Sequence, residues 1–292
     1  KIFRFLKNLI NSDKMPHVLM LSGNKGLGKS TIINHILHYY FDETNYDEER
    51  NIIQNNTSFN KQFLNNIFPN IYYLNGYDFK NIKIEDVRIL KKNLLKTSIS
   101  NKKRFIILDN VETFNINSLN ALLKIIEEPS NNNYFFLIDN KSKPLLETIR
   151  SRCLEIKIFL NKKERENIIS ALQNTFEIEI ILDKDIIFSS PGNFLIYNYI
   201  FEKKKININD KFSTNFNLIL NLHRKEKEVL YKDLLFFYTD YYLKDINKKK
   251  NINSVKYIKN RSFFIKNMNE YFSYNLSHSS LISSIESHPI YE

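Results

Sequence analysis

Residues 17–31 of the chain read HVLMLSGNKGLGKST. An apolar run, Val18 to Leu21, precedes the pattern Gly-x-x-x-x-Gly-Lys-Ser of Gly23 to Ser30, and a helix-compatible apolar repeat follows it. Strand, glycine-rich loop and helix in this order form a P-loop. The pattern alone is short, but the flanking strand and helix strengthen it. The stretch therefore predicts nucleotide binding in an α/β domain.

Each residue type in this loop has a physical role in holding phosphate. Glycines let backbone N–H groups turn inward, Lys29 supplies a positive charge, and the hydroxyl of Ser30 can ligate Mg²⁺. The N-terminus of the following helix adds to the same anion site. The alternative is a relic loop that keeps its shape and binds nothing. The residues predicted to hold ATP or ADP are Gly23, Asn24, Lys25, Gly26, Leu27, Gly28, Lys29, Ser30 and Thr31.

Length and composition indicate a globular protein of two or three domains. The chain has 292 residues, of which 42% are hydrophobic and 14% aromatic. Lys and Arg number 43 against 32 Asp and Glu, which gives a net charge of +11. This excess favours anionic partners, nucleic acid first. The chain is also rich in Lys, Asn and Ile, so the charge alone does not establish a binding surface.

The single cysteine, Cys153, excludes an internal disulfide and any multi-cysteine zinc site, and it fits a reducing cytoplasm. We expect a cytoplasmic protein without a membrane segment, because no signal pattern and no apolar run of about 18 residues is present. The nearest candidate, Leu230 to Leu243, is interrupted by Lys232, Asp233 and Asp240. It reads as a buried aromatic helix.

Short apolar runs alternate with helical patterns over the first half of the chain. Strands are expected at Val18–Leu21, Ile71–Leu74, Phe105–Leu108, Tyr134–Ile138 and Leu154–Ile158. Helices are expected at Phe3–Ile10, after Lys29, and at Ile82–Thr97, Asn117–Glu128 and Leu145–Ile149. One further helix is expected around Phe63–Phe68, within the polar excursion Asp42–Asn70. Pro144 suits the first position of the helix that includes Leu145–Ile149. This alternation predicts a five-stranded parallel sheet covered on both faces.

The strand pattern fades beyond Asn161. Asn161 can cap a helix, residues 190–193 (SPGN) mark a break before another, and the remainder reads as aromatic helices. Lysine clusters at residues 203–205 and 248–250 are interpreted as solvated helix ends rather than phosphate sites.

A P-loop enzyme needs an acid at the end of a second apolar strand to hold Mg²⁺, and Asp109 closes the run RFIILD. Ser30 and Asp109 are therefore the predicted metal residues. Hydrolysis also needs a group that activates water, but the next residue is Asn110, and an amide cannot act as a base at neutral pH. Glu112 is expected to point elsewhere. The sequence thus supports binding better than hydrolysis.

The segment Ser118 to Cys153 resembles the bacterial clamp-loader AAA+ family. The resemblance rests on the L-L-K-x-x-E-E-P helix end, Leu122 to Pro129, and on T-I-R-S-R-C, Thr148 to Cys153. The MPH that precedes the P-loop segment and the stretch IKIEDVRILKK agree with it. It covers roughly residues 1–160. It implies an AAA+ α/β domain at 1–160, a small helical lid at 161–208 and a helical collar at 209–292.

Proteins of this family form a five-subunit arc that opens a sliding clamp and places it on DNA. The implied partners are gamma/tau and delta type subunits in a hetero-pentamer, the clamp, and primer-template DNA through the assembled complex, with no membrane. The family's S-R-C arginine reaches a neighbour's ATP site, so Arg152 is the implied catalytic residue, an arginine finger in trans. The alternative is that Arg152 only pairs with a local carboxylate. Cys153 is expected to be a small buried residue.

The chain departs from the family pattern at several positions. The region after the P-loop helix carries no cysteine, so no zinc is expected. Asn110 stands where active members have glutamate, and Asn193 stands where a sensor arginine usually follows S-P-G. Asn140 matches the sensor-1 position loosely, because Asp139 could hold that place.

Four hypotheses follow. The first is a clamp-loader subunit that binds ATP or ADP with Mg²⁺, hydrolyses little and supplies Arg152 to a neighbour. The second is an active gamma/tau-type ATPase, against which Asn110 and Asn193 argue. The third is a structural stator with a vestigial P-loop. A nucleoside kinase is a distant fourth, since that chemistry does not call for the S-R-C segment.

Overall fold

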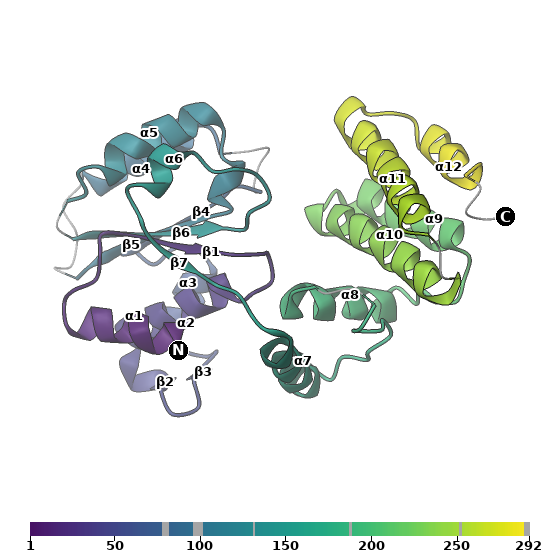
Figure 1. The fold of residues 1–292 in the computed structure, drawn as a ribbon. Coiled ribbons are helices and arrows are strands. Elements are labelled where there is room, and N and C mark those ends of the chain that lie inside the picture. Colours follow the sequence, from purple (N-terminus) through teal and green to yellow (C-terminus); the bar gives the residue numbers. More distant parts are fainter. Residues whose placement is uncertain (78–81, 96–101, 131, 187–188, 251–252, 289–292) are drawn as a thin grey trace. The chain divides into compact units, whose positions relative to one another are not determined.

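The computed structural model describes residues 1–77, 82–95, 102–130, 132–186, 189–250 and 253–288. The chain divides into two compact units, Lys1–Lys163 and Glu164–Glu292, which are considered separately below (Figure 1). The expected further division of the second unit into a lid and a collar stays a prediction.

A five-stranded parallel sheet forms the centre of the first unit. Its spatial order is β4-β5-β6-β1-β7, and each neighbouring pair is parallel. The five expected strands are confirmed, each within one residue at either end. The strands are β1 Val18–Ser22, β4 Ile71–Asn75, β5 Arg104–Asp109, β6 Asn133–Asp139 and β7 Leu154–Lys157.

Successive residues of the central strands point into different cores, which explains why these strands are apolar throughout. Met20, Ile106 and Leu137 belong to one cluster, whereas Leu19 and Ile107 belong to the other. Helices α1 (Ile2–Asn11), α2 (Lys29–Phe41) and α3 (Ser58–Leu64) cover one face of the sheet, and α4 (Ile84–Leu94), α5 (Ile116–Ile126) and α6 (Glu147–Arg150) cover the other (Figure 1). The prediction of a sheet covered on both faces is confirmed.

Two helix predictions are wrong in detail. The expected helix around Phe63–Phe68 ends at Leu64, because Asn65 caps it and Asn66 turns the chain with a φ of 56°. Pro144 is not the first residue of a helix, since α6 begins at Glu147. The end of the expected helix Ile82–Thr97 falls outside the described residues.

The polar excursion also contains short elements that the sequence did not predict. Tyr46–Asp47 (β2) and Ile52–Ile53 (β3) pair as a two-stranded antiparallel hairpin, preceded by the 3-10 helix Glu43–Asn45. Outside this excursion, a second 3-10 helix, Val111–Thr113, begins one residue after β5, with Asn110 between them. Strands of two residues are too short to give a recognisable alternation in sequence.

The second unit is built from helices around one apolar cluster. The helices are α7 Lys162–Phe176, α8 Pro191–Lys203, α9 Phe212–Glu226, α10 Val229–Lys250, α11 Ser254–Tyr274 and α12 His278–Glu286. Their shared cluster extends from Ile169 to Ile285. Ser190 occupies the N-cap position of α8 and Pro191 its first turn, so the predicted break is confirmed. The predicted aromatic helix lies within α10, where Tyr238 is almost fully buried.

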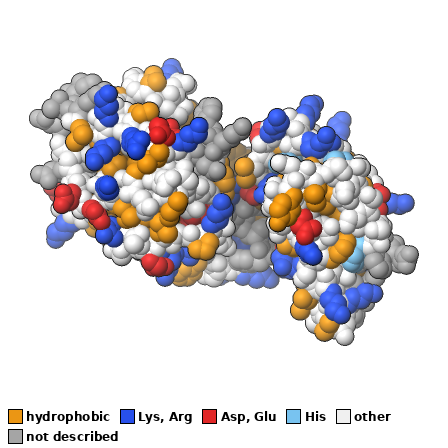
Figure 2. Space-filling model, turned by 90° about the horizontal axis from the view of Figure 1, so that it is seen from above, with side chains coloured by type: hydrophobic (Ala, Val, Ile, Leu, Met, Phe, Trp, Pro, Cys, Tyr) orange, Lys and Arg blue, Asp and Glu red, His pale blue; other side chains and the backbone are white. Residues whose placement is uncertain are grey.

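On the face drawn in Figure 2, charged and hydrophobic side chains are intermixed. Figure 2 shows Lys and Arg side chains scattered over the visible face of both units, with Asp, Glu and hydrophobic residues among them. Over the described ranges, no helix combines the length and apolar character that a membrane crossing requires.

Candidate nucleotide-binding site

The phosphate loop connects β1 to α2 at the carboxyl end of the sheet. Gly23 and Gly28 have φ angles of 149° and 81°, a region that disfavours side chains. A Cβ at position 23 would also lie 2.4 Å from the carbonyl oxygen of Ile158, so only glycine fits there. Gly28 is the N-cap of α2 and no side chain caps this end. An uncapped helix N-terminus beside turned glycines is the kind of arrangement that can bind an anion.

Lys29 is buried beneath this loop, with a relative exposure of 3%. Its Nζ donates to the carbonyl oxygens of Gly23 at 2.5 Å and Asn24 at 2.8 Å. Burial lowers the pKa of Lys29 to about 8, although the charges of Asp109 and Glu112, among others, oppose this shift. The ammonium group therefore holds the loop together from inside, at the place where phosphate would be bound.

Ser30 and Asp109 lie together, as a metal site requires. The Oγ of Ser30 donates to the Oδ2 of Asp109 at 3.3 Å, and the phenol of Tyr73 in β4 donates to the same oxygen at 2.8 Å. The backbone N–H of Asn110 donates to Oδ1. A hydroxyl and a carboxylate at this separation are the hard oxygen donors that suit Mg²⁺, so the residues fit the expected ion.

Three asparagine side chains connect the ends of three neighbouring strands. Asn140, after β6, donates to the Oδ1 of Asn110 at 2.7 Å, and Asn110, after β5, donates to the Oδ1 of Asn75 in β4 at 2.9 Å. Asn110 is buried and has a φ of 54°. Polar residues that directly follow or close apolar strands are the sequence signal for such a chain, and Asn75 could have been identified from it. The residue directly after Asp109 is therefore an amide whose side chain bonds to both neighbouring asparagines.

Glu112 lies closer to the site than the sequence reasoning suggested. It is 4% exposed, and its Oε1 accepts a hydrogen bond from Ser142 at 2.7 Å. Its other oxygen is buried and has no hydrogen-bond partner among the described residues. The charge of Glu112 raises the pKa of Lys29, against the effect of burial. Glu112 therefore contributes to the electrostatics of the phosphate loop.

The two arginines of the T-I-R-S-R-C segment have different surroundings. Arg150 lies 3.8 Å from Asp139 and 3.7 Å from Glu155, whose carboxylate also accepts a hydrogen bond from Ser22. Arg150 thus ties the segment to the sheet.

Arg152 is more exposed, and its side chain makes an ion pair with Glu127 at 2.6 Å. It also donates to the carbonyl oxygen of Thr148 at 2.9 Å. The structure does not bring Arg152 to the phosphate loop of its own chain: its polar partners among the described residues all lie in α5, α6 and the segments that follow them.

The remaining predicted loop residues have separate environments. Lys25 places its Nζ 5.0 Å from the centre of the Tyr77 ring, a cation–π contact. Leu27 packs against the core under α2, and Thr31 is exposed in the first turn of that helix. Asn193, the departure from the family pattern, lies in the first turn of α8 in the second unit.

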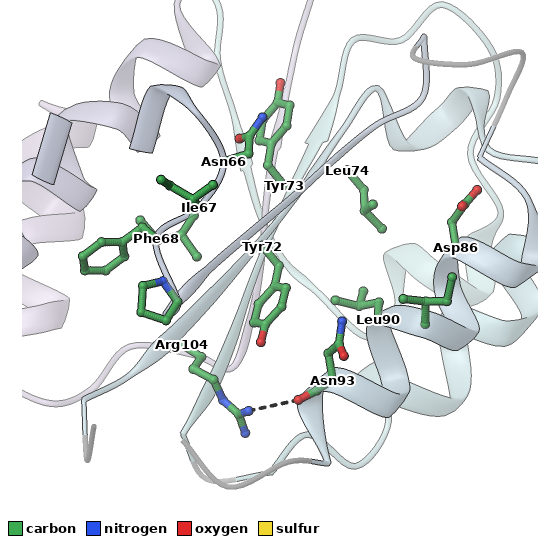
Figure 3. Close-up of a pocket in the computed structure, with 13 residues that line it drawn as sticks. Asn66, Ile67, Phe68, Tyr72, Tyr73, Leu74, Asp86, Leu90, Asn93 and Arg104 are labelled. Atoms are coloured by element: carbon green, nitrogen blue, oxygen red, sulfur yellow. Dashed lines mark hydrogen bonds between the residues drawn. The ribbon is translucent and has the colours of Figure 1, made fainter. Parts of the chain in front are cut away.

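A cavity of about 470 Å³ lies beside β4 and α4 rather than at the phosphate loop (Figure 3). Tyr72, Leu90, Asn93 and Arg104 are among its lining residues. A second cavity, of about 330 Å³, is bordered by Ser30, Thr31 and Tyr73 and so adjoins the candidate metal site.

Comparisons with known proteins agree with this geometry. The family model described as "DNA polymerase III, delta subunit" matches residues 1–161. DNA polymerase III subunit delta' of Buchnera aphidicola (subsp. Schizaphis graminum) is 29% identical over 202 residues, which cover 64% of this chain and 59% of that protein. DNA polymerase III subunit delta' of Bacillus subtilis is 26% identical over 153 residues, covering 52% and 45%. The chain spans about half the length of these curated relatives.

A solved structure shares the fold over almost the whole chain. It is a DNA polymerase III gamma subunit-related protein of Thermotoga maritima, with a TM-score of 0.54, 16% identity and 96% coverage of both chains. At this identity the likeness describes the fold alone.

Proposed function

This chain belongs to the DNA polymerase III, delta subunit family, and from that premise we propose that it works as a clamp-loader subunit of the delta-prime type. In this role it binds ATP or ADP with Mg²⁺, hydrolyses the nucleotide slowly or not at all, and supplies Arg152 to the ATP site of a neighbouring subunit. The observation that carries the proposal is the amide chain through Asn110, which lies beside a complete phosphate loop.

Nucleotide binding is supported by the loop geometry. The turned glycines, the start of α2 and the buried Lys29 provide N–H groups and positive charge for phosphate oxygens. Lys29 would exchange its bonds with the loop carbonyls for bonds to phosphate. A bound Mg²⁺ would neutralise phosphate charge, with Ser30 and Asp109 as its protein partners.

Slow hydrolysis is supported by the absence of a base next to Asp109. Asn110 has no proton-accepting nitrogen or carboxylate, and both of its side-chain groups are engaged with Asn75 and Asn140. Glu112, the nearest following carboxylate, is buried and held by Ser142. This arrangement favours the proposal over an active gamma/tau-type ATPase.

Arg152 fits the role of a finger because it is exposed enough to leave its local partner. Its side chain is 36% exposed and that of Glu127 is 45% exposed. An exposed ion pair contributes only about 0–1 kcal/mol, so exchanging the carboxylate for a neighbour's phosphate costs little. A guanidinium is always charged and can bind two phosphate oxygens at once.

The proposed partners are gamma/tau and delta type subunits, the sliding clamp and, through the assembled complex, primer-template DNA. A structural stator remains the second candidate. It is favoured by one observation, that the Nζ of Lys29 bonds to the carbonyl oxygens of Gly23 and Asn24 in its own loop.

Two experiments test this function. The full chain is titrated with a fluorescent ATP analogue in Mg²⁺, and saturable binding that Lys29→Ala weakens at least tenfold is expected. No saturable binding would support the stator.

In parallel, the tagged chain is purified from its own cells. The other loader subunits should be recovered with it, and their absence would contradict the assignment.

A further inference from the structure

The carboxylate of Asp109 has three donors, and they differ in how firmly they are placed. Oδ1 accepts from the backbone N–H of Asn110 at 2.8 Å. Oδ2 accepts from the phenol of Tyr73 at 2.8 Å and from the hydroxyl of Ser30 at 3.3 Å. The predicted metal residue Asp109 is therefore oriented mainly by the N–H of Asn110, directly after β5, and by Tyr73, which the sequence did not identify.

We infer that Tyr73 is a positioning residue of the Mg²⁺ site, the fixed partner that keeps Asp109 aimed at the ion while Ser30 is the exchangeable one. This inference rests on the proposed nucleotide binding. If Ser30 were to ligate a Mg²⁺ ion bound with the nucleotide, its bond to Oδ2 would be given up, whereas the bond from Tyr73 would be kept.

Distances and connectivity distinguish the two hydroxyls. A separation of 3.3 Å is long for an O–H···O bond, whereas 2.8 Å is typical of a well-formed one. Ser30 belongs to the phosphate loop, but Tyr73 belongs to β4, which is paired in register with β5 up to Asn75 and Asp109. The tyrosine and the carboxylate thus share one rigid sheet.

The lone pairs of the carboxylate permit this exchange. Each oxygen can accept about two hydrogen bonds, so Oδ2 accommodates Tyr73 together with one further donor. In the structure that donor is Ser30. If the oxygen of Ser30 ligated Mg²⁺ instead, Oδ2 would have room for another donor while Tyr73 kept its bond, so the carboxylate of Asp109 would not have to rotate.

The ring of Tyr73 is held by packing. It lies against the apolar cluster beneath α2 and α3, so its hydroxyl is placed with little loss of side-chain freedom when the site is formed. Tyr72, the preceding residue, packs against the cluster on the other face. Figure 3 shows the two rings on opposite sides of the strand, with Tyr72 directed toward Asn93 and Arg104.

Tyr72 and Tyr73 therefore give a matched pair of variants, Tyr73→Phe and Tyr72→Phe, each of which removes one hydroxyl from the same strand. The affinity of the full chain for a fluorescent ATP analogue is measured in excess Mg²⁺ and in EDTA. For Tyr73→Phe we expect the Kd in Mg²⁺ to rise about fivefold to tenfold and the Kd in EDTA to stay unchanged. A Mg²⁺ titration at fixed nucleotide should show a matching rise in the concentration of half-saturation. Tyr72→Phe should alter none of these values.

Equal losses in Mg²⁺ and EDTA would show that Tyr73 only supports the fold, and they would overturn the inference. Unchanged Mg²⁺ dependence would overturn it as well. Both outcomes leave the proposed nucleotide binding intact. If the unmodified chain binds no nucleotide in either condition, the proposed function and the inference fail together.

Discussion

Asn140 donates its side-chain amide to the Oδ1 of Asn110 at 2.7 Å, and this bond connects the segments that follow β5 and β6. Asn110 in turn donates to Asn75 at 2.9 Å. Because the middle amide is buried and its backbone is left-handed, the local structure depends on it even though it cannot act as a base. The three asparagine side chains thus connect the ends of β4, β5 and β6 directly beside Asp109.

Asn110→Ala should lower the free energy of unfolding by about 3–4 kcal/mol. Two side-chain bonds are lost at about 1 kcal/mol each, and alanine in the left-handed region adds about 1–2 kcal/mol. Asn110→Gly removes the same bonds without the backbone strain, so it should be less damaging. Urea unfolding of the three proteins measures both differences. Equal stability of all three would mean that the amide chain contributes nothing.

Nucleotide affinity should fall as pH rises above about 8. Burial lowers the pKa of Lys29 to about 8, so the free protein loses this charge above that pH, while bound phosphate favours the charged form. Affinity should not depend on pH below the pKa that Lys29 has in the free protein, and above it affinity should decrease by up to about tenfold per pH unit. In that upper range, nucleotide binding should be accompanied by proton uptake. Calorimetric titrations between neutral and alkaline pH would show this.

Lys29→Arg provides the control for that profile, because arginine stays charged throughout the range. Its affinity, whatever its absolute value, should not follow the same pH dependence. A flat profile for the unmodified chain would indicate that Lys29 stays charged or does not contact phosphate.

Gly23→Ala should be more destabilising than Gly28→Ala. Both residues have left-handed φ angles, but the new Cβ at position 23 would meet the Ile158 carbonyl at 2.4 Å, whereas nothing lies within 4 Å at position 28. The strain common to both is about 1–2 kcal/mol, and overpacking adds about 1–3 kcal/mol at position 23. Thermal or urea unfolding gives the comparison. Equal losses of stability in the two variants would show that the backbone after β7 shifts to make room for the added methyl group.

Cys153 should react slowly with thiol reagents in the native protein. Burial raises the pKa of its thiol to about 12, and the nearby charge of Glu155 acts in the same direction. The Sγ also donates to the carbonyl oxygen of Ile149 at 3.1 Å. Labelling with an aromatic disulfide near neutral pH should be slow until urea unfolds the chain. Rapid native labelling would contradict this.

The sheet and its helices could be predicted because their signals are local. The run Tyr134–Ile138 is apolar throughout since both faces of β6 are covered, and the P-loop pattern fixes the turn into α2. The start of α6 was misplaced because Pro144 is compatible with a helix start but equally with the extended segment that precedes Glu147.

The candidate site was only partly predictable, because its remaining partners come from different strands. Tyr73 contacts Asp109 through the register of β4 and β5, which a single sequence does not give. Glu112 was expected to point away, yet the short 3-10 helix after β5 keeps it buried near Lys29. The sequence analysis allowed for a local carboxylate partner of Arg152, but it did not identify that partner as Glu127.

The central claim is that Arg152 acts in another subunit's ATP site, and the steady-state ATPase of the assembled loader tests it most directly. The complex is reconstituted with the unmodified chain, with Arg152→Ala, or with Glu127→Gln, which removes the local partner but keeps the cation. Loss of an arginine finger typically costs at least about a thousandfold in kcat at its site. In the Arg152→Ala complex the neighbouring site should therefore contribute almost nothing to the total kcat, while KM should change little. The Glu127→Gln complex should keep the kcat of the unmodified complex. An unchanged kcat for the Arg152→Ala complex would contradict the account.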